Sequence, residues 1–193
     1  ADFSWTPAYV DQGLYSVTFI ATDDSLATDT ETITITVNDA GNQNPILASI
    51  GDQSTTEGLL LSFGVSASDP EGALPSLTTS VLPTGADFQD NGDGTGVFTW
   101  TPTYVQQGDY TVTFTAEDDS TAIDQETITI SVIDAGNQTP TLDPIGDQST
   151  SEGSTLAFQV SASDPEGVFP TLTTSALPNN ATFVDNGDGT GDF

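Results

Sequence analysis

Residues 108–117 read Gly-Asp-Tyr-Thr-Val-Thr-Phe-Thr-Ala-Glu, and this stretch decides the fold class. From Tyr110 onward, apolar side chains occupy every second position, and threonine occupies the positions between them. A period of two with a β-branched polar face is typical of a strand that is buried on one side. The sequence therefore predicts a β-strand that packs one face against a core.

Similar short segments recur on both sides of this strand. Turn-forming glycine, proline, asparagine and aspartate residues separate them, and no segment of useful length has helical periodicity. Seven strands in about 95 residues is the size of an immunoglobulin-like (Ig-like) β-sandwich. The predicted strands are 46–50, 61–67, 77–82, 86–89, 97–101, 110–116 and 127–132.

The chain also contains an internal repeat with a period of 95 residues. Residues 4–98 align with residues 99–193 without a gap and are identical at 65 of these 95 positions. The polar linker 39–45 recurs as 134–140, and each copy ends in proline, as is common between strands. We therefore expect the C-terminal half of one repeat in residues 1–41, a complete repeat in 42–137 and the N-terminal half of the next in 138–193.

These boundaries predict an all-β protein of tandem Ig-like or cadherin-like seven-strand sandwiches arranged end to end. A boundary near the termini is the alternative, but it would split the alternating pattern around Trp5 and Trp100. Each half-repeat exposes an apolar face and an open sheet edge, which invites pairing with another strand. We expect neighbouring copies, or the continuation of the same chain in a longer array, to complete these halves.

The charge of the chain excludes several partners. Its 193 residues include 29 aspartates and glutamates but no lysine, arginine or histidine, so the formal charge is −29. Nucleic-acid binding needs lysine and arginine to displace phosphate counterions, and anionic membranes repel such a surface. No run of 18 apolar residues predicts membrane insertion. Metal ions and dissolved salt are the natural counter-charges.

Composition also limits catalysis. Without histidine, cysteine or lysine the chain can build no catalytic triad, reactive thiolate or Schiff base. Paired carboxylates can hydrolyse glycosides, but every acidic motif of this kind recurs with the repeat, which suits a structural array better. We therefore expect no enzyme.

Residues 82–118 carry the motifs of a known family. These are Leu82-Pro83, Phe88, Gly94-Thr95-Gly96, Phe98-Thr99-Trp100-Thr101-Pro102 and the run from Gly108 to Asp118. They resemble bacterial "putative Ig" domains, also called dystroglycan-type cadherin-like repeats. The resemblance covers the whole chain. It implies an Ig-like fold and an extracellular or cell-surface location, where such repeats serve as stalks, adhesins and spacers of large proteins.

The linker Asp134-Ala135-Gly136-Asn137-Gln138-Thr139-Pro140 is similar to the calcium linker of cadherins, Asp-x-Asn-Asp-Asn-x-Pro, with three ligand positions changed. Ca²⁺ takes six to eight oxygen ligands, and loops at one end of a sandwich cluster in space. A β-turn with proline at its second position is the alternative for the Asp-Pro-Glu-Gly motif. The candidate Ca²⁺ ligands are Asp39, Asn42, Glu57, Asp69 and Glu71, with their repeat equivalents Asp134, Asn137, Glu152, Asp164 and Glu166.

Other motifs have structural interpretations. The glycine-rich segment 90–96 resembles a calcium loop, but proline stands where the bidentate glutamate should be, so a hairpin turn is favoured. Trp5 and Trp100 could stack on sugars, although their phase with the neighbouring phenylalanines favours the core. Segment 117–120 is expected to be a solvated turn. The sequence thus predicts a structural fibre or stalk; an adhesive module with a cell-surface, homophilic or carbohydrate ligand is the alternative.

Overall fold

The computed structural model describes residues 2–193, which form β-strands joined by turns. Two compact units are present. The first contains the chain up to Gly51 together with Ser62–Thr99 and Thr111–Ile128, and the second contains Asp52–Leu61, Trp100–Tyr110 and Thr129–Phe193. No helix among the described residues is long and apolar enough to cross a membrane.

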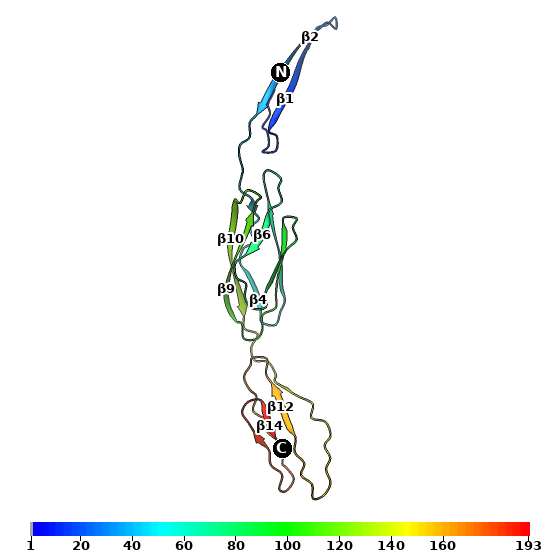
Figure 1. The fold of residues 1–193 in the computed structure, drawn as a ribbon, viewed down its shortest axis with the longest axis vertical. Coiled ribbons are helices and arrows are strands. Elements are labelled where there is room, and N and C mark those ends of the chain that lie inside the picture. The colour runs from blue at the N-terminus through cyan, green and yellow to red at the C-terminus, as the bar shows by residue number, and fades with distance from the viewer. Residues whose placement is uncertain (1) are drawn as a thin grey trace. The chain divides into compact units, whose positions relative to one another are not determined.

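The N-terminal element is the antiparallel hairpin of β1 (Gly13–Thr22) and β2 (Thr28–Val37), visible in blue in Figure 1. Before β1, the Trp5 ring packs edge-on against Tyr15 with the ring centroids 4.8 Å apart. The Tyr15 hydroxyl donates a hydrogen bond to the backbone oxygen of Asp11 at 2.8 Å. This contact is a tyrosine corner, which fixes the entry of the chain into the strand.

The strands between residues 46 and 133 form two four-stranded sheets, in the orders β3-β5-β8-β7 and β4-β10-β9-β6. We call these eight strands the central sandwich, and the prediction of an all-β sandwich is confirmed. The strands are β3 (Ile46–Leu47), β4 (Gln53–Thr56), β5 (Leu61–Ser68), β6 (Ser76–Thr79), β7 (Asp87–Asp90), β8 (Thr95–Trp100), β9 (Gly108–Glu117) and β10 (Ile123–Ile133).

In the first unit, an aromatic cluster joins the two sheets. Phe114 of β9 is 1% exposed, and its ring lies 5.9 Å from Phe63, 5.4 Å from Phe88 and 6.2 Å from Phe98, centroid to centroid. These three phenylalanines belong to β5, β7 and β8 of the opposite sheet. Edge-on aromatic contacts at these distances are favourable beyond the burial of their area. The cluster therefore holds the two sheets face to face.

In the second unit, Trp100 of β8 is 1% exposed and packs edge-on against Tyr110 of β9 at 4.9 Å. The Tyr110 hydroxyl donates to the backbone oxygen of Gln106 at 3.0 Å, which repeats the tyrosine corner of the hairpin. Gly58 has a φ of 75°, and a Cβ there would meet the Tyr104 hydroxyl at 2.7 Å. Glycine is therefore required at position 58 for two independent reasons. The prediction that Trp100 fills the core is confirmed.

The C-terminal residues form a third four-stranded sheet, with the order β11-β12-β14-β13. Each strand is the repeat equivalent of a strand in the sheet β3-β5-β8-β7, in the same order. Phe158 and Phe193 stack at 4.9 Å, as their equivalents Phe63 and Phe98 do. The strands are β11 (Thr141–Leu142), β12 (Gln159–Ser163), β13 (Val184–Asp185) and β14 (Thr190–Asp192).

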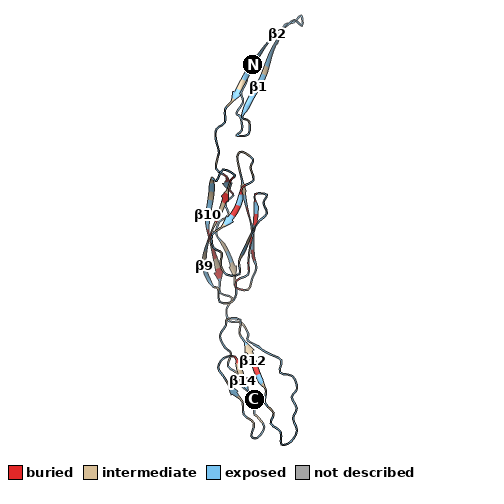
Figure 2. Cartoon of the chain, viewed as in Figure 1, coloured by how far each residue is buried: buried red, intermediate tan, exposed pale blue. Residues whose placement is uncertain are grey.

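Burial differs sharply between the copies, as Figure 2 shows for β9 and β10 against the hairpin. Phe19 of the hairpin is 45% exposed, whereas its equivalent Phe114 is 1% exposed. Trp5 is 38% exposed, so the expectation that it fills a core is wrong for this copy. The reason is that no second sheet among the described residues covers β1 and β2.

One strand was not predicted from the sequence. The segment Gln53–Thr56 is polar and does not alternate, yet it forms β4 by pairing in parallel with residues 130–133 of β10. The central sandwich therefore has eight strands where seven were predicted. Each of the seven predicted strands overlaps an observed one. The repeat boundaries at residues 41 and 137 stay a prediction.

Phe114→Ala should lower the free energy of unfolding by about 3–5 kcal/mol, because it leaves a cavity among three aromatic rings. Phe19→Ala is the matched control, since it is the same change at the equivalent, exposed position, and it should cost about 1 kcal/mol or less. The measurement is urea unfolding followed by Trp100 fluorescence, in a Trp5→Phe background and at concentrations where the chain is monomeric. Equal losses for the two variants would contradict the assignment of Phe114 to the core.

Candidate functional site

The acidic motif after β5 forms a β-turn that holds the first linker. Gly72 donates its N–H to the backbone oxygen of Asp69 at 3.0 Å, and Glu71 donates its N–H to Asp69 Oδ1 at 2.7 Å. Glu71 Oε1 accepts a hydrogen bond from the N–H of Gln43, in the linker, at 3.0 Å. The turn interpretation of Asp-Pro-Glu-Gly is confirmed, and the turn also anchors the incoming chain.

Two oxygens of this turn are buried without a hydrogen-bond partner among the described residues: Asp69 Oδ2 and Glu71 Oε2. Burial is the main cause that raises the pKa of the Glu71 carboxyl, and the adjacent Asp69 carboxyl raises it further, although the Gln43 N–H acts in the opposite direction. A buried carboxylate oxygen without a donor favours a proton or a cation beside it. The pair Asp69–Glu71 therefore holds two carboxylate oxygens without a hydrogen-bond partner next to the first linker.

The second linker repeats this arrangement. Glu166 Oε1 accepts from the N–H of Gln138 at 2.6 Å, and Asp164 Oδ1 accepts from the N–H of Glu166 at 3.0 Å. Glu166 Oε2 is again buried without a partner in residues 2–193. The neighbouring Asp164 carboxyl is the first cause that raises the pKa of Glu166, and burial is the second. Both linkers thus use the same carboxylate contact, one repeat apart.

Asp118 is a site residue that sequence reasoning missed, because it was assigned to a solvated turn. Its side chain is 6% exposed and accepts from Asn42 Nδ2 at 2.8 Å, from the N–H of Ser120 at 2.9 Å and from the N–H of Ala122 at 2.8 Å. The bond from Asn42 is the main cause that lowers the pKa of Asp118. The recurrence of this aspartate as Asp23 was the available signal, but only the fold brings it to the linker.

Glu57 directly follows β4, and its side chain contacts the start of the second linker. It is 4% exposed, and its Oε2 accepts from the N–H of Ala135 at 3.3 Å, while its Oε1 is buried without a partner among the described residues. Its own N–H donates to the backbone oxygen of Ile133 at 3.0 Å. The equivalent Glu152 is exposed. Glu57 therefore ties the end of β10 to the linker in the second unit.

The remaining predicted ligands stabilise the linkers themselves. Asp39 Oδ1 accepts from the N–H of Gly41 at 2.9 Å, and Asp134 Oδ1 accepts from the N–H of Gly136 at 2.7 Å. Asn137 donates its side-chain amide to the backbone oxygen of Gln138. Within residues 2–193 no three acidic side chains gather closely enough to hold a metal ion. The structure pairs Asp69 with Glu71 and Asp164 with Glu166 but assembles no larger cage in the part of the chain that it describes, and calcium binding stays a prediction.

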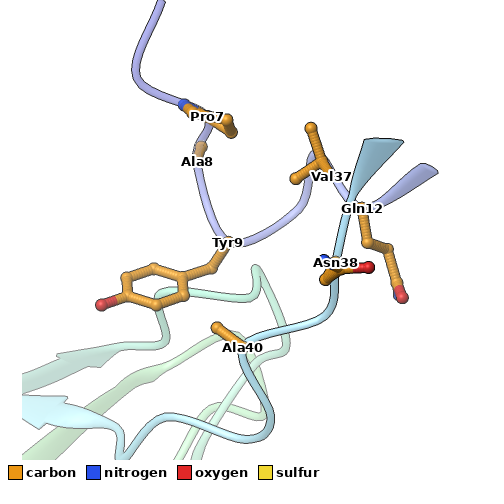
Figure 3. Close-up of a pocket in the computed structure, with 7 residues that line it drawn as sticks. All are labelled: Pro7, Ala8, Tyr9, Gln12, Val37, Asn38 and Ala40. Atoms are coloured by element: carbon orange, nitrogen blue, oxygen red, sulfur yellow. The ribbon is translucent and has the colours of Figure 1, made fainter. Parts of the chain in front are cut away.

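A pocket of about 310 Å³ lies where the hairpin meets its linker (Figure 3). Figure 3 shows Tyr9 and Ala40 on one side of the pocket, and Val37, Asn38 and Gln12 on the other. No lining residue is acidic, so the pocket lacks the paired carboxylates of a glycosidase. The lining residues are Pro7, Ala8, Tyr9, Gln12, Val37, Asn38 and Ala40.

Two facing sheets, repeated tyrosine corners and repeated carboxylate-anchored linkers define an Ig-like repeat module. Residues 2–38 and 44–133 match the family described as "Putative Ig domain", and the chain belongs to this family. The gap between the two matched segments falls within the first linker. The resemblance seen in the sequence is thereby confirmed.

Parts of the chain are similar to individual known proteins. A stretch of 76 residues is 40% identical to chitinase A of Pseudoalteromonas piscicida, which covers 39% of the chain but only 9% of that protein. The structure is similar to human CDH23 EC21-23, with a TM-score of 0.46, 19% identity, and 92% of this chain and 63% of that one covered. It is also similar to the sialic acid binding region of the Streptococcus sanguinis SK1 adhesin, with a TM-score of 0.44, 17% identity, and 65% and 45% of the chains covered.

Asn42→Ala should raise the pKa of Asp118, because it removes the main hydrogen bond that stabilises the charged form. A lowered pKa adds stability above the unfolded value of about 3.9 that is lost as the pH falls through the folded pKa. The variant should therefore melt below the native protein at neutral pH, and the gap should close on acidification. Carboxyl NMR titration and melting curves at several pH values measure both effects. Gln43→Ala keeps the backbone donor to Glu71, so it should leave Asp118 unchanged; an equal shift there would refute the direct contact.

Proposed function

We propose that the chain is a non-catalytic repeat segment of an extracellular or surface protein, where it serves as a stalk or fibre. The observation that carries this proposal is the repeated anchoring of the linkers by Glu71 and Glu166. Each carboxylate holds a backbone N–H of the preceding linker, which limits the freedom of that linker. Linkers pinned in the same way at a constant period suit a stiff array, because such arrays depend on nearest-neighbour contacts.

Two features support the absence of catalysis in this proposal. The sequence supplies no histidine, cysteine or lysine. The close acidic pairs, Asp69 with Glu71 and Asp164 with Glu166, belong to single turns, whereas a glycosidase places its two carboxyl groups on opposite sides of a bound sugar. The similarity to chitinase A spans less than a tenth of that protein, so its activity is not carried over to this chain.

A binding module is the second candidate. Tyr9 is 50% exposed beside the pocket at the base of the hairpin, and exposed aromatic rings with a polar end are common at interfaces. The ligand would be a carbohydrate or another cell-surface molecule. Binding to a glycan array that is lost in Tyr9→Ala but retained in Tyr104→Ala would favour this candidate over the stalk.

Electron microscopy of the full-length protein tests the proposed stalk directly. The full-length protein should appear as rods whose length grows in regular steps with the number of repeats. Compact particles without such a relation between length and repeat number would contradict the proposal.

Calcium is the proposed counter-ion of the junctions. The buried oxygens Asp69 Oδ2, Glu71 Oε2 and Glu166 Oε2 lack donors in the described chain, and the chain offers no cationic side chain to neutralise them. Ca²⁺ accepts carboxylate, amide and backbone oxygens in flexible geometry. Linker carbonyls and the amide oxygens of Asn42 and Asn137 would supply further ligands.

Millimolar Ca²⁺ should therefore raise the melting temperature more than sodium chloride of equal ionic strength does. Screening alone acts through the Debye length, about 8 Å at physiological strength, and is the same for both salts. The double variant Glu71→Gln/Glu166→Gln should lose the extra stabilisation. Asp24→Asn/Asp87→Asn removes the same charge at exposed positions away from the linkers and should keep it. Coincident melting curves in the two salts would leave screening as the whole effect.

A further inference from the structure

The turn between β7 and β8 contains a chemically labile pair of residues. The chain has two Asn-Gly pairs, Asn91-Gly92 in this turn and its repeat equivalent Asn186-Gly187. Glycine suits a tight turn because it has no side chain, and for the same reason its backbone nitrogen easily approaches the preceding asparagine. Both turns therefore hold an asparagine with the chemistry to modify itself.

The modification is deamidation through a cyclic imide. The backbone nitrogen of the glycine attacks the side-chain carbonyl carbon of the asparagine and forms a C–N bond. The side-chain nitrogen leaves as ammonia and takes the proton that the backbone nitrogen gives up. Water then opens the ring to aspartate or isoaspartate. The attack needs the nitrogen and the carbonyl carbon in near-attack geometry, so the conformation of the turn controls its rate.

We infer that hydrogen bonds to Asp90 and Thr95, and to their equivalents Asp185 and Thr190, keep the two asparagines from deamidating in the folded repeat. This inference does not depend on the stalk function proposed above. The seven residues 90–96 are identical to residues 185–191, so the chain contains the same device twice.

The aspartates bind the nucleophile of the reaction. Asp90 Oδ1 accepts a hydrogen bond from the N–H of Gly92 at 2.9 Å, and Asp185 Oδ1 accepts one from the N–H of Gly187 at 3.0 Å. A carboxylate is far too weak a base to remove an amide proton, so it does not activate this nitrogen. Its negative charge also disfavours the amide anion that would attack. Each hydrogen bond therefore restrains the nitrogen without promoting the reaction.

The second oxygen of each aspartate fixes the carboxylate itself. Asp90 Oδ2 accepts from the N–H of Leu77 at 3.1 Å, and Asp185 Oδ2 accepts from the N–H of Leu172 at 3.2 Å. Leu77 is 3% exposed and lies in β6, which belongs to the other sheet of the central sandwich. Asp90 thus binds the glycine from a position that the packing of the two sheets determines.

The threonines bind the electrophile of the reaction. Asn91 Nδ2 donates to Thr95 Oγ1 at 2.9 Å, and Thr95 Oγ1 donates to Asp93 Oδ1 at 2.5 Å. The Thr95 hydroxyl, followed by the Thr95 backbone N–H, lowers the pKa of Asp93, so this last acceptor is ionised at neutral pH. Charged acceptors strengthen such bonds. Equivalent bonds of 3.0 Å and 2.6 Å in the second turn join Asn186, Thr190 and Asp188.

Deamidation would damage the hairpin permanently. The pairing of β7 with β8 runs in register from Asp87 opposite Thr99 to Asp90 opposite Gly96. Isoaspartate adds one carbon to the backbone directly after the last of these pairs, and a sheet with one buried face does not tolerate a shifted register. A repeat that stays open long enough therefore converts to a form that no longer refolds correctly. The folded turn prevents this loss.

Deamidation rates in the folded and unfolded chain test the protection. The whole chain is incubated in mildly alkaline buffer, with and without concentrated urea, and digested with pepsin at acidic pH. Mass spectrometry then measures the conversion of Asn91 and Asn186 separately. We expect Asn91 to react at least about tenfold more slowly in the folded chain, because the bound groups reach attack geometry only when the turn opens. Equal rates with and without urea would overturn the inference.

Aspartate variants identify the residue that protects each site. Asp90→Ala should raise the rate at Asn91 by at least about fivefold and leave Asn186, in the same sample, within about twofold. Asp185→Ala should do the reverse. Asp87→Ala is the matched control, since it removes an exposed carboxylate three residues earlier in β7, and both rates should stay within about twofold. An unchanged rate at Asn91 in folded Asp90→Ala would contradict the inference.

A threonine variant covers the case in which Asp90→Ala does not fold, since that change also removes the bond to Leu77. Thr95→Val keeps the shape of the side chain but offers no acceptor to Asn91 Nδ2. It should raise the rate at Asn91 by about threefold or more and leave Asn186 unchanged. Melting curves establish which variants are folded. A folded Thr95→Val chain without a selective rise at Asn91 would overturn the inference.

Discussion

The fold depends on one requirement: a β-sheet with an apolar face needs a second sheet over it. Phe114 shows what this covering does, because it is 1% exposed beneath β5, β7 and β8, whereas Phe19 in the same local sequence is 45% exposed. The difference comes from the neighbouring sheet and not from the strand itself. Hydrophobic burial is the dominant favourable term in folding, so the covered face of β9 contributes stability that the exposed face of the hairpin does not.

A second constraint is the absence of any cationic side chain. Backbone N–H groups take the role that lysine and arginine have elsewhere. Asp52, Asp124 and Glu126 each accept hydrogen bonds from the backbone of another segment, at 2.7 Å from Thr129, 2.8 Å from Leu47 and 2.7 Å from Ile50. A charged acceptor strengthens such a bond. The carboxylates are therefore part of the scaffold, and they hold loops that carry few apolar residues.

Carboxylates also hold the two linkers by accepting hydrogen bonds. Asp118 and Glu71 bind the first linker, and Glu57 and Glu166 bind the second. Their pKa values respond in opposite directions, since hydrogen-bond donors lower the pKa of Asp118 while burial beside Asp69 raises that of Glu71. Ionised Asp118 strengthens the contact with the first linker at neutral pH, whereas ionised Glu71 places a negative charge there that no cationic side chain compensates. A stiff repeat array would then depend on how that charge is neutralised.

The sequence by itself determined the fold class, the repeat and most strands, because alternation with a period of two is a local property. It also supported the hairpin turn at residues 90–96, whose asparagine and glycine residues suit tight turns, and β7 and β8 do flank it. The Asp-Pro-Glu-Gly turn was left open against a metal site, although its geometry is equally local. The candidate ligands were recognised as a set only because the linker resembles the calcium linker of cadherins. The residues that hydrogen-bond to them were not predicted.

Tertiary structure decided the rest. Gln53–Thr56 is a strand while the nearly identical 148–151 is not, since only the first has β10 beside it. Trp100 is buried and Trp5 is exposed for the same reason. Asp118 becomes a linker anchor because folding brings it to Asn42, 76 residues earlier in the chain. Pairing, burial and desolvation are contacts between distant segments, and no local pattern contains them.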